Sequence, residues 1–163
     1  MKLSEALTKL KNLKSQLSRV EGYVNSSVIH FVDEQPEYSY AEESKVRSQL
    51  VNAILDLKTQ IQVTNTNTKA DFQGSSVTLA HLILLNSQLR SEMAFLSKLL
   101  GNKVEYEGGY LSGGRTKETI KKVFAEGFDK KHIRKSIETL EKAKEELESL
   151  LAHLNLKTDL IEK

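Results

Sequence analysis

The sequence predicts a mainly α protein in which long antiparallel helices form a four-helix or coiled-coil bundle, interrupted by a small β-hairpin or strand. Apolar side chains recur at helical spacing in four long segments, and polar or glycine-rich stretches separate these segments. Only 39% of the 163 residues are hydrophobic while 28% are charged, a balance typical of long amphipathic helices. We therefore expect one helical domain over residues 1–163, with helices at about 3–27, 40–64, 77–100 and 130–155 and a glycine-rich basic hairpin at 103–128.

The first helix carries two apolar rows with a seven-residue spacing, which is the pattern of a coiled-coil seam. The rows consist of Leu3, Leu10, Leu17 and Val24, and of Ala6, Leu13 and Val20. An amphipathic helix on a membrane surface is the alternative, but such helices carry bulky aromatic side chains on the apolar face. Tyr23 is the one aromatic residue in this segment, so packing against another helix is favoured.

The second helix follows an irregular stretch. β-Branched and aromatic side chains at residues 28–32 indicate a short strand, followed by an acidic loop. Ser39 and Glu42 then have the spacing of a capping box, which starts a helix. The Thr and Asn side chains at 64–68 compete for backbone hydrogen bonds, so the helix is expected to end there and a loop to continue to residue 75. The apolar row of this helix consists of Val46, Leu50, Ile54, Leu57 and Ile61.

The third helix is apolar around much of its circumference, which predicts a central position in contact with helices of its own chain and of a second copy. Gly101 provides its C-terminal cap. The fourth helix begins after Asp129, a good N-cap, and Lys144 within its seam either sets the register or lies at the edge of the seam. The third helix has the row Leu79, Leu82, Leu85, Leu89, Met93, Leu96 and Leu100, and the fourth has Ile133, Ile137, Leu140, Leu147, Leu151 and Leu154.

Composition excludes several classes of protein. The absence of cysteine excludes a disulfide framework, a thiol nucleophile and cysteine-ligated metal, and agrees with a cytoplasmic location. No apolar run approaches the ~20 residues that span a bilayer, so we expect no membrane interaction. The net charge is only +2, but residues 115–135 hold eight basic and three acidic side chains. Because the overall charge is small and the last helix is acidic, nucleic-acid binding is the weakest of the expected functions.

The glycine-rich segment before this basic stretch approximates a phosphate-binding loop. Gly109 is separated by four residues from Gly114, which Arg115 and Thr116 follow, and this spacing resembles the Walker A pattern with arginine in place of lysine. No apolar strand precedes this segment and the chain lacks βαβ alternation, so we do not expect nucleotide hydrolysis. Residues 119–124 either form a strand that pairs with residues 104–106 or form a helix.

A glycine-rich loop beside many cations suits an anionic ligand, because backbone amides and arginine both bind phosphate well. A solvated hairpin with a basic flank is the alternative interpretation. The ligand-binding residues predicted on this basis are Tyr110, Gly113, Gly114, Arg115, Thr116, Lys117, Lys121, Lys122, His132 and Arg134, together with Asn65 and Asn67 from the Thr/Asn stretch.

We predict no catalytic residue, no metal site and no cofactor. The four histidines are isolated in sequence, without the spacing of a zinc site. Ser112 does not stand in the pattern of an activated nucleophile. Paired carboxylates such as Glu145 and Glu146 point apart on a helix and are expected to be solvated.

The opening residues 1–7, the stretch 61–68 and the closing stretch 155–160 resemble an uncharacterised family of small bacterial helical proteins that often carries the label septicolysin. The Gly108–Gly114 loop and the Leu156–Lys157 pair depart from that family. The resemblance implies an α-rich oligomer, and it supplies no catalytic residue. The label suggests a cytolysin, but the apolar rows described above are coiled-coil seams.

The sequence thus favours a non-catalytic homo-oligomer that holds, and thereby sequesters, a small phosphorylated, nucleotide-like ligand. Small helical phage proteins that take up nucleotide immune signals have this general architecture, which is an analogy and not evidence of homology. The alternative is a structural or adaptor coiled-coil protein whose partner is another protein.

Overall fold

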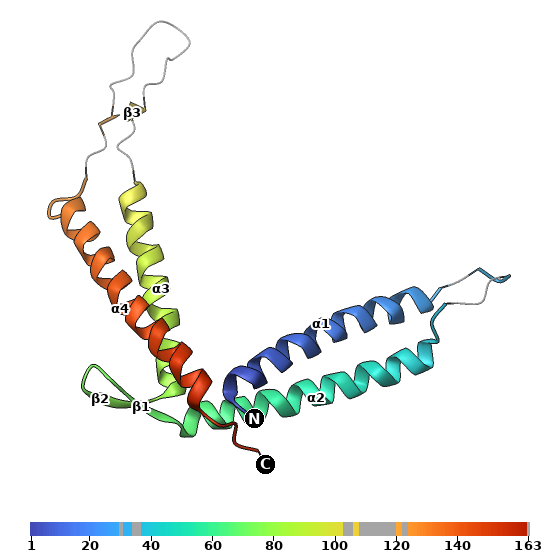
Figure 1. The fold of residues 1–163 in the computed structure, drawn as a ribbon. Coiled ribbons are helices and arrows are strands. Elements are labelled where there is room, and N and C mark those ends of the chain that lie inside the picture. Colours follow the sequence, from blue (N-terminus) through green and yellow to red (C-terminus); the bar gives the residue numbers. More distant parts are fainter. Residues whose placement is uncertain (30, 34–36, 103–105, 108–119, 122–123, 163) are drawn as a thin grey trace, which may run out of the picture. The chain divides into compact units, whose positions relative to one another are not determined.

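The computed structural model describes residues 1–29, 31–33, 37–102, 106–107, 120–121 and 124–162, and the chain divides into two compact units, Met1–Leu84 with Ser149–Lys163, and Leu85–Glu148. The prediction of a mainly α fold with a small β-hairpin is confirmed (Figure 1). The helices are α1 (Leu3–Ser27), α2 (Tyr40–Asn67), α3 (Leu79–Gly101) and α4 (Lys130–Lys157). The strands are β1 (Lys69–Phe72), β2 (Ser75–Thr78), β3 (Tyr106–Glu107) and β4 (Ile120–Lys121).

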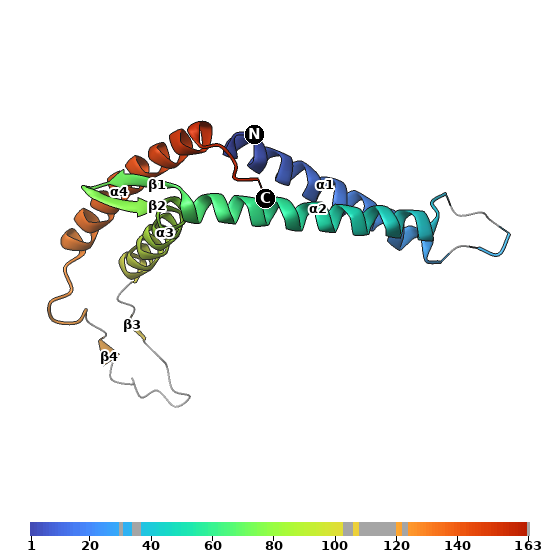
Figure 2. The same cartoon turned by 90° about the horizontal axis from the view of Figure 1, so that it is seen from below.

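The first unit is built on the antiparallel pair α1 and α2, which lie side by side along their length (Figures 1 and 2). The seam residues Leu3 and Ala6 of α1 are buried against Leu57 and Ile61 of α2, and Val20 and Ile54 are buried further along the helices. Leu79 and Leu160 complete this core cluster, in which Leu10, Leu13, Leu151 and Leu154 are partly buried. Two amphipathic helices bury their apolar faces against each other, so the apolar rows form the core of this unit.

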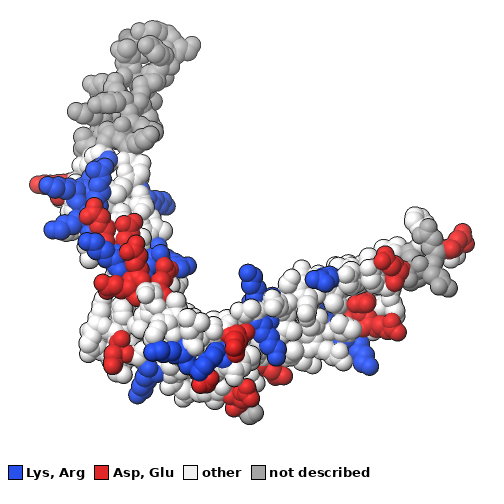
Figure 3. All heavy atoms as spheres, in the orientation of Figure 1, with Lys and Arg blue, Asp and Glu red and all other residues white. Residues whose placement is uncertain are grey.

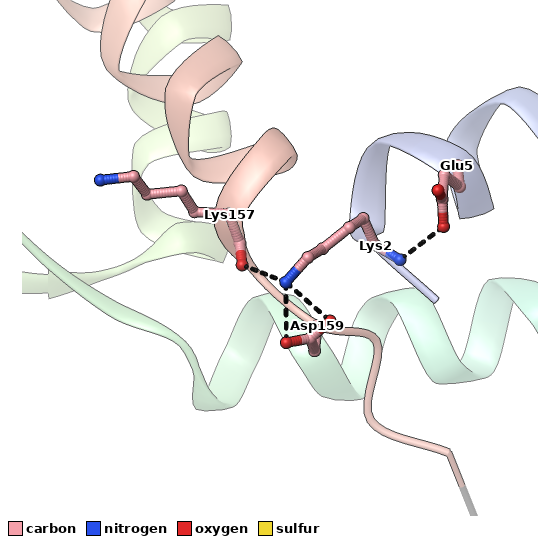
Figure 4. Close-up of polar contacts among 4 residues, drawn as sticks. All are labelled: Lys2, Glu5, Lys157 and Asp159. Carbon is pink, nitrogen blue, oxygen red and sulfur yellow. Dashed lines mark hydrogen bonds and ion pairs between the residues drawn. The ribbon is translucent and has the colours of Figure 1, made fainter.

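The C-terminal residues clasp the start of α1. The Leu3 amide donates to the Thr158 carbonyl at 2.9 Å, and the Leu160 amide donates to the Met1 carbonyl at 2.8 Å. Figure 4 shows the Lys2 ammonium against the Asp159 carboxylate at 2.9 Å, with a further hydrogen bond to the Lys157 carbonyl. The sequence gives no local signal for this contact, because its two sides lie more than 150 residues apart.

A β-hairpin occupies residues 69–78, where the sequence analysis placed a loop, so that expectation was wrong. β1 and β2 pair antiparallel from Lys69 opposite Thr78 to Phe72 opposite Ser75. Gln73 and Gly74 form the turn with φ of 50° and 77°. Positive φ at both central residues is the mark of a two-residue hairpin turn, and glycine adopts it without strain.

Among the described residues 28, 29 and 31–33 no strand is present, so the strand expected there was also wrong. Val28 keeps a helical backbone, and its amide donates to the Asn25 carbonyl. Within the described ranges no strand pairs with this segment, and β-branched composition alone does not hold a strand together.

The second unit contains α3 from residue 85 onward and, antiparallel to it, α4 up to residue 148. Arg90 of α3 forms an ion pair with Glu148 of α4, and Leu147 and Ile133 are the buried apolar residues of α4. Asp129 caps α4 as predicted, since its carboxylate accepts from the Lys131 amide at 2.8 Å. Lys144 is partly exposed and binds Glu148 at 3.1 Å, which agrees with a position at the seam edge. Short strands β3 and β4 pair Tyr106 with Lys121 and Glu107 with Ile120, so the strand alternative holds at 120–121.

Candidate ligand-binding surface at the start of α4

The predicted ligand-binding residues fall into three groups. Tyr110, Gly113, Gly114, Arg115, Thr116, Lys117 and Lys122 lie outside the described residues, and Lys121 is described through its backbone on β4. His132 and Arg134 lie on the first turns of α4 in the second unit. Asn65 and Asn67 lie at the end of α2 in the first unit.

A stacked aromatic pair leads into α4. The rings of Phe124 and Phe128 stack with centroids 5.2 Å apart, and the Lys130 ammonium lies 4.3 Å from the centre of the Phe124 ring. Gly127 has φ of 83°, which lets the chain turn sharply between the two rings. The aromatic pair thus fixes the turn, and the cation–π contact holds the Lys130 charge at the helix start.

Four cations follow on the first two turns of α4. Lys131, Arg134 and Lys135 are exposed and Lys130 is partly buried, and Figure 3 shows blue atoms gathered at this end of the helix. The amino end of a helix is already positive, so each cation there costs roughly 0.3–1 kcal/mol at the helix terminus. Such an arrangement is poor for stability and good for attracting an anion.

A groove of about 440 Å³ lies between α3 and α4. Its apolar wall is formed by Leu96, Ile133 and Leu140, and its polar rim by Glu92, His132, Ser136 and Thr139. The Ser136 and Thr139 hydroxyls donate to the carbonyls of His132 and Lys135 at 3.1 and 3.0 Å. Their oxygens therefore remain acceptors on the groove side, while Glu92 can accept hydrogen bonds from amino or hydroxyl groups.

The Asn65 and Asn67 side chains lie in the last turn of α2. The Asn67 amide donates to the Val63 carbonyl at 2.7 Å, one turn back in the same helix. Asn65 is 8% exposed, and no described group donates a hydrogen bond to its Oδ1. A buried amide oxygen of this kind is a natural site for an ordered water.

Sequence reasoning missed Glu92, Ser136 and Thr139. His132, Ser136 and Thr139 follow each other at spacings of four and three, which places them on one helix face, and this signal was available. Glu92 has no such signal, because its place in the groove depends on the pairing of α3 with α4.

The Arg90–Glu148 ion pair lies further along the same two helices. Hydrogen bonds from Arg90, and then from Lys144, lower the pKa of the Glu148 carboxyl. The carboxylate is therefore charged at neutral pH and links α3 to α4.

In the part of the chain that the structure describes, no helix is both long and apolar enough to cross a membrane. Within the same ranges, no group of three or more acidic or histidine side chains is arranged to hold a metal ion.

No family profile matches the chain, and no curated protein is similar to it at a significant level. A solved structure is similar in fold: the crystal structure of a functionally unknown conserved protein from Corynebacterium diphtheriae. The two chains are 20% identical, each is covered over 99% of its length, and the TM-score is 0.78. At this identity the likeness shows a common fold and carries no function.

Proposed function

We propose that the protein is a non-catalytic, homo-oligomeric binding protein of the cytoplasm that sequesters a small phosphorylated, nucleotide-like ligand. The observation that carries this proposal is the groove between α3 and α4, together with the four cations on the first two turns of α4. The resemblance to the septicolysin-labelled family fits an oligomer of this kind and stays a prediction.

The parts of the groove match the parts of a nucleotide. The apolar wall of Leu96, Ile133 and Leu140 can cover the face of a base. Glu92 and the rim hydroxyls can hydrogen-bond to sugar hydroxyls or to amino groups of the base. Arg134 and its neighbouring lysines can then bind the phosphates, because guanidinium and ammonium groups form charge-assisted hydrogen bonds with them.

The rim hydroxyls support binding without catalysis. Ser136 and Thr139 donate their protons to backbone carbonyls of their own helix, so neither hydroxyl is hydrogen-bonded to a general base. A nucleophilic hydroxyl needs such a base within reach.

The apolar surface of α3 supports self-association. No side chain of α3 from residue 85 to residue 101 is buried, although this is the most apolar helix, and Phe95 is 56% exposed. Exposed apolar rows on a helix are typically covered by other helices. A second copy of the chain would supply such helices.

Isothermal titration calorimetry with a panel of linear and cyclic nucleotides tests the proposal. Arg134→Ala is expected to weaken the binding of a responding nucleotide by at least about tenfold. Arg19→Ala, an exposed arginine on α1 in the other unit, serves as the matched control and should leave binding unchanged. Arg115→Ala tests the glycine-rich segment in the same assay. Absence of heat with every nucleotide, or an unchanged affinity in Arg134→Ala, would contradict the proposal.

The second candidate is a structural or adaptor protein that binds another protein. The exposed apolar side chains on the helices, such as Leu55 and Phe95, favour it. Tight oligomerisation without nucleotide binding, together with tolerance of Arg134→Ala and Arg115→Ala, would support this candidate instead. Native mass spectrometry of protein purified directly from cells reports the number of chains and any bound small molecule together.

A further inference from the structure

The carboxylate and the hydroxyls that line the groove between α3 and α4 share one property, which is that they accept hydrogen bonds. The ionised carboxylate of Glu92 has no proton to donate, and Ser136 and Thr139 donate theirs to backbone carbonyls of their own helix. Among the lining residues that the structure describes there is no Lys or Arg. The part of a ligand that lies in this groove must therefore supply hydrogen-bond donors and carry no negative charge.

This chemistry determines which part of a nucleotide the groove takes. The Glu92 carboxylate repels phosphates, so these lie outside the groove. The apolar side chains of Leu96, Ile133 and Leu140 suit the flat face of a base. The volume of about 440 Å³ is in the range of small-molecule pockets. The groove is therefore suited to the base of a nucleotide and not to its phosphates.

The common bases differ in the donors that they present to such a carboxylate. Adenine and cytosine each present an amino group beside an unprotonated ring nitrogen, which repels a carboxylate oxygen. Uracil presents a single N–H between two carbonyl oxygens. Guanine alone among them places an amino group next to a ring N–H, so that both groups can donate to the two oxygens of one carboxylate in charge-assisted hydrogen bonds.

We propose that the groove is selective for guanine and that Glu92 determines this selectivity. The guanine selectivity rests on the proposed function, because it specifies which nucleotide that function takes. Glu92 of α3 accepts from the amino group and the ring N–H of the base, and His132 of α4 donates to the adjoining carbonyl of the base. The two residues come from different helices, so the site exists only where α3 and α4 pair.

Isothermal titration calorimetry compares guanosine monophosphate with inosine monophosphate, which differs from it only in lacking the amino group. We expect the guanine nucleotide to bind at least about tenfold more tightly, since it makes one more charge-assisted hydrogen bond. Glu92→Gln should weaken its binding by at least about tenfold and remove most of the difference between the two nucleotides. A neutral amide has a single acceptor oxygen, so it cannot accept from both donors of guanine.

Glu92→Gln should also bind adenosine monophosphate more tightly than the wild type does, because an amide can both donate to and accept from the adenine edge. This gain distinguishes altered selectivity from a variant that fails to fold. Glu141→Gln is the matched control: this exposed carboxylate of α4 is not among the residues that line the groove, and its loss should leave every affinity unchanged.

Methyl NMR spectra of the wild-type protein with guanosine locate the binding site. The ring currents of a bound base should shift the methyl signals of Leu96, Ile133 and Leu140, which line the groove. The methyl signals of Leu10 and Leu13, which pack against the core of the first unit, should keep their positions. Shifts confined to residues outside the groove would overturn the proposal.

Equal affinities for the guanine and inosine nucleotides, or a difference that Glu92→Gln preserves, would overturn the guanine selectivity and leave the proposed function standing. If guanosine binds in a Glu92-dependent way and no more weakly than its monophosphate, the guanine site is supported and a phosphorylated ligand is contradicted. Absence of heat with every guanine compound would overturn the guanine selectivity, and binding of another nucleotide in that case would leave the proposed function intact.

Discussion

The buried hydroxyl of Thr64 connects α2 to the C-terminal tail by hydrogen bonds. It is fully buried, its hydroxyl donates to the Gln60 carbonyl at 2.8 Å, and the same oxygen accepts from the Ile161 amide at 2.9 Å. A hydroxyl can do both because it has one proton and two lone pairs. The side chain therefore satisfies its own helix and also anchors a segment almost 100 residues away.

We predict that Thr64→Val loosens the tail. Valine has the same shape but cannot accept the Ile161 amide, so the free energy of unfolding should fall by about 1 kcal/mol. The Ile161 amide should also exchange its hydrogen faster in hydrogen–deuterium exchange. Thr64→Ser keeps the oxygen and should leave the exchange rate of that amide near the wild-type value. Faster exchange in both variants would show that the methyl group, and not the hydroxyl, holds the tail.

The second prediction at this scale concerns pH and the clasp between Lys2 and Asp159. The hydrogen bond from Lys2 lowers the pKa of the Asp159 carboxyl. A lowered pKa in the folded protein stabilises it above the unfolded value of about 3.9, and this contribution is lost as the pH falls through the folded pKa. Asp159→Asn should therefore lower the melting temperature at pH 7, and the difference from wild type should shrink steadily as the pH falls below the unfolded value. Thermal melts of both proteins over a series of pH values below 7 measure it, and a difference that stays constant down to the lowest pH would contradict this origin.

At the scale of elements, the sequence predicts helices well where an apolar row is long, as in α1 and α4. Its error at the end of α2 has a clear cause. The Thr and Asn side chains were expected to end the helix by competing for its hydrogen bonds, yet α2 continues to Asn67. Thr64, Thr66 and Asn67 all donate to carbonyls of the preceding turn, so their side chains are satisfied within the helix and do not end it.

The hairpin and the groove were harder to predict for a different reason. A two-residue turn in a hairpin is usually signalled by Asn-Gly, and here Gln73 precedes Gly74, so the local signal is weak. The groove residue Glu92 becomes a neighbour of His132 only when two helices pair, which no short motif encodes. The cluster of cations around His132 and Arg134 is local in sequence, which is why the sequence points to these two residues, and their role in binding stays a prediction.

Two glycines should respond to alanine in opposite directions, which is the third prediction. Gly74 has φ of 77°, so Gly74→Ala forces a side chain into the left-handed region and should lower the free energy of unfolding by at least about 1 kcal/mol. Gly22 lies within α1 with open space around its Cα, so Gly22→Ala should raise that free energy by roughly 0.5–1 kcal/mol. Urea denaturation followed by circular dichroism measures both. A free energy that Gly74→Ala leaves unchanged or raises would contradict the assignment of the turn, and one that Gly22→Ala lowers would contradict the open space around that residue.

At the scale of the whole molecule, the sequence does not reveal that the chain divides into two units. The apolar rows of α3 and α4 continue without a break past Leu84 and Ser149, where one unit gives way to the other. The division becomes visible only in what is buried. The cluster of Leu3, Leu79 and Leu160 belongs to the first unit, and Leu147 is fully buried in the second.

This distribution of buried leucines predicts which amides exchange faster when a core leucine is replaced by alanine. Leu79→Ala removes a fully buried side chain and should lower the free energy of unfolding by about 2–4 kcal/mol, against less than about 0.5 kcal/mol for the exposed Leu55→Ala. Because local openings follow local packing, the amides at the start of α1 and in the tail should exchange faster, while those of residues 130–145 keep their rates. Leu147→Ala should give the reverse pattern. Equal acceleration everywhere with either substitution would mean that the two units share one cooperative core.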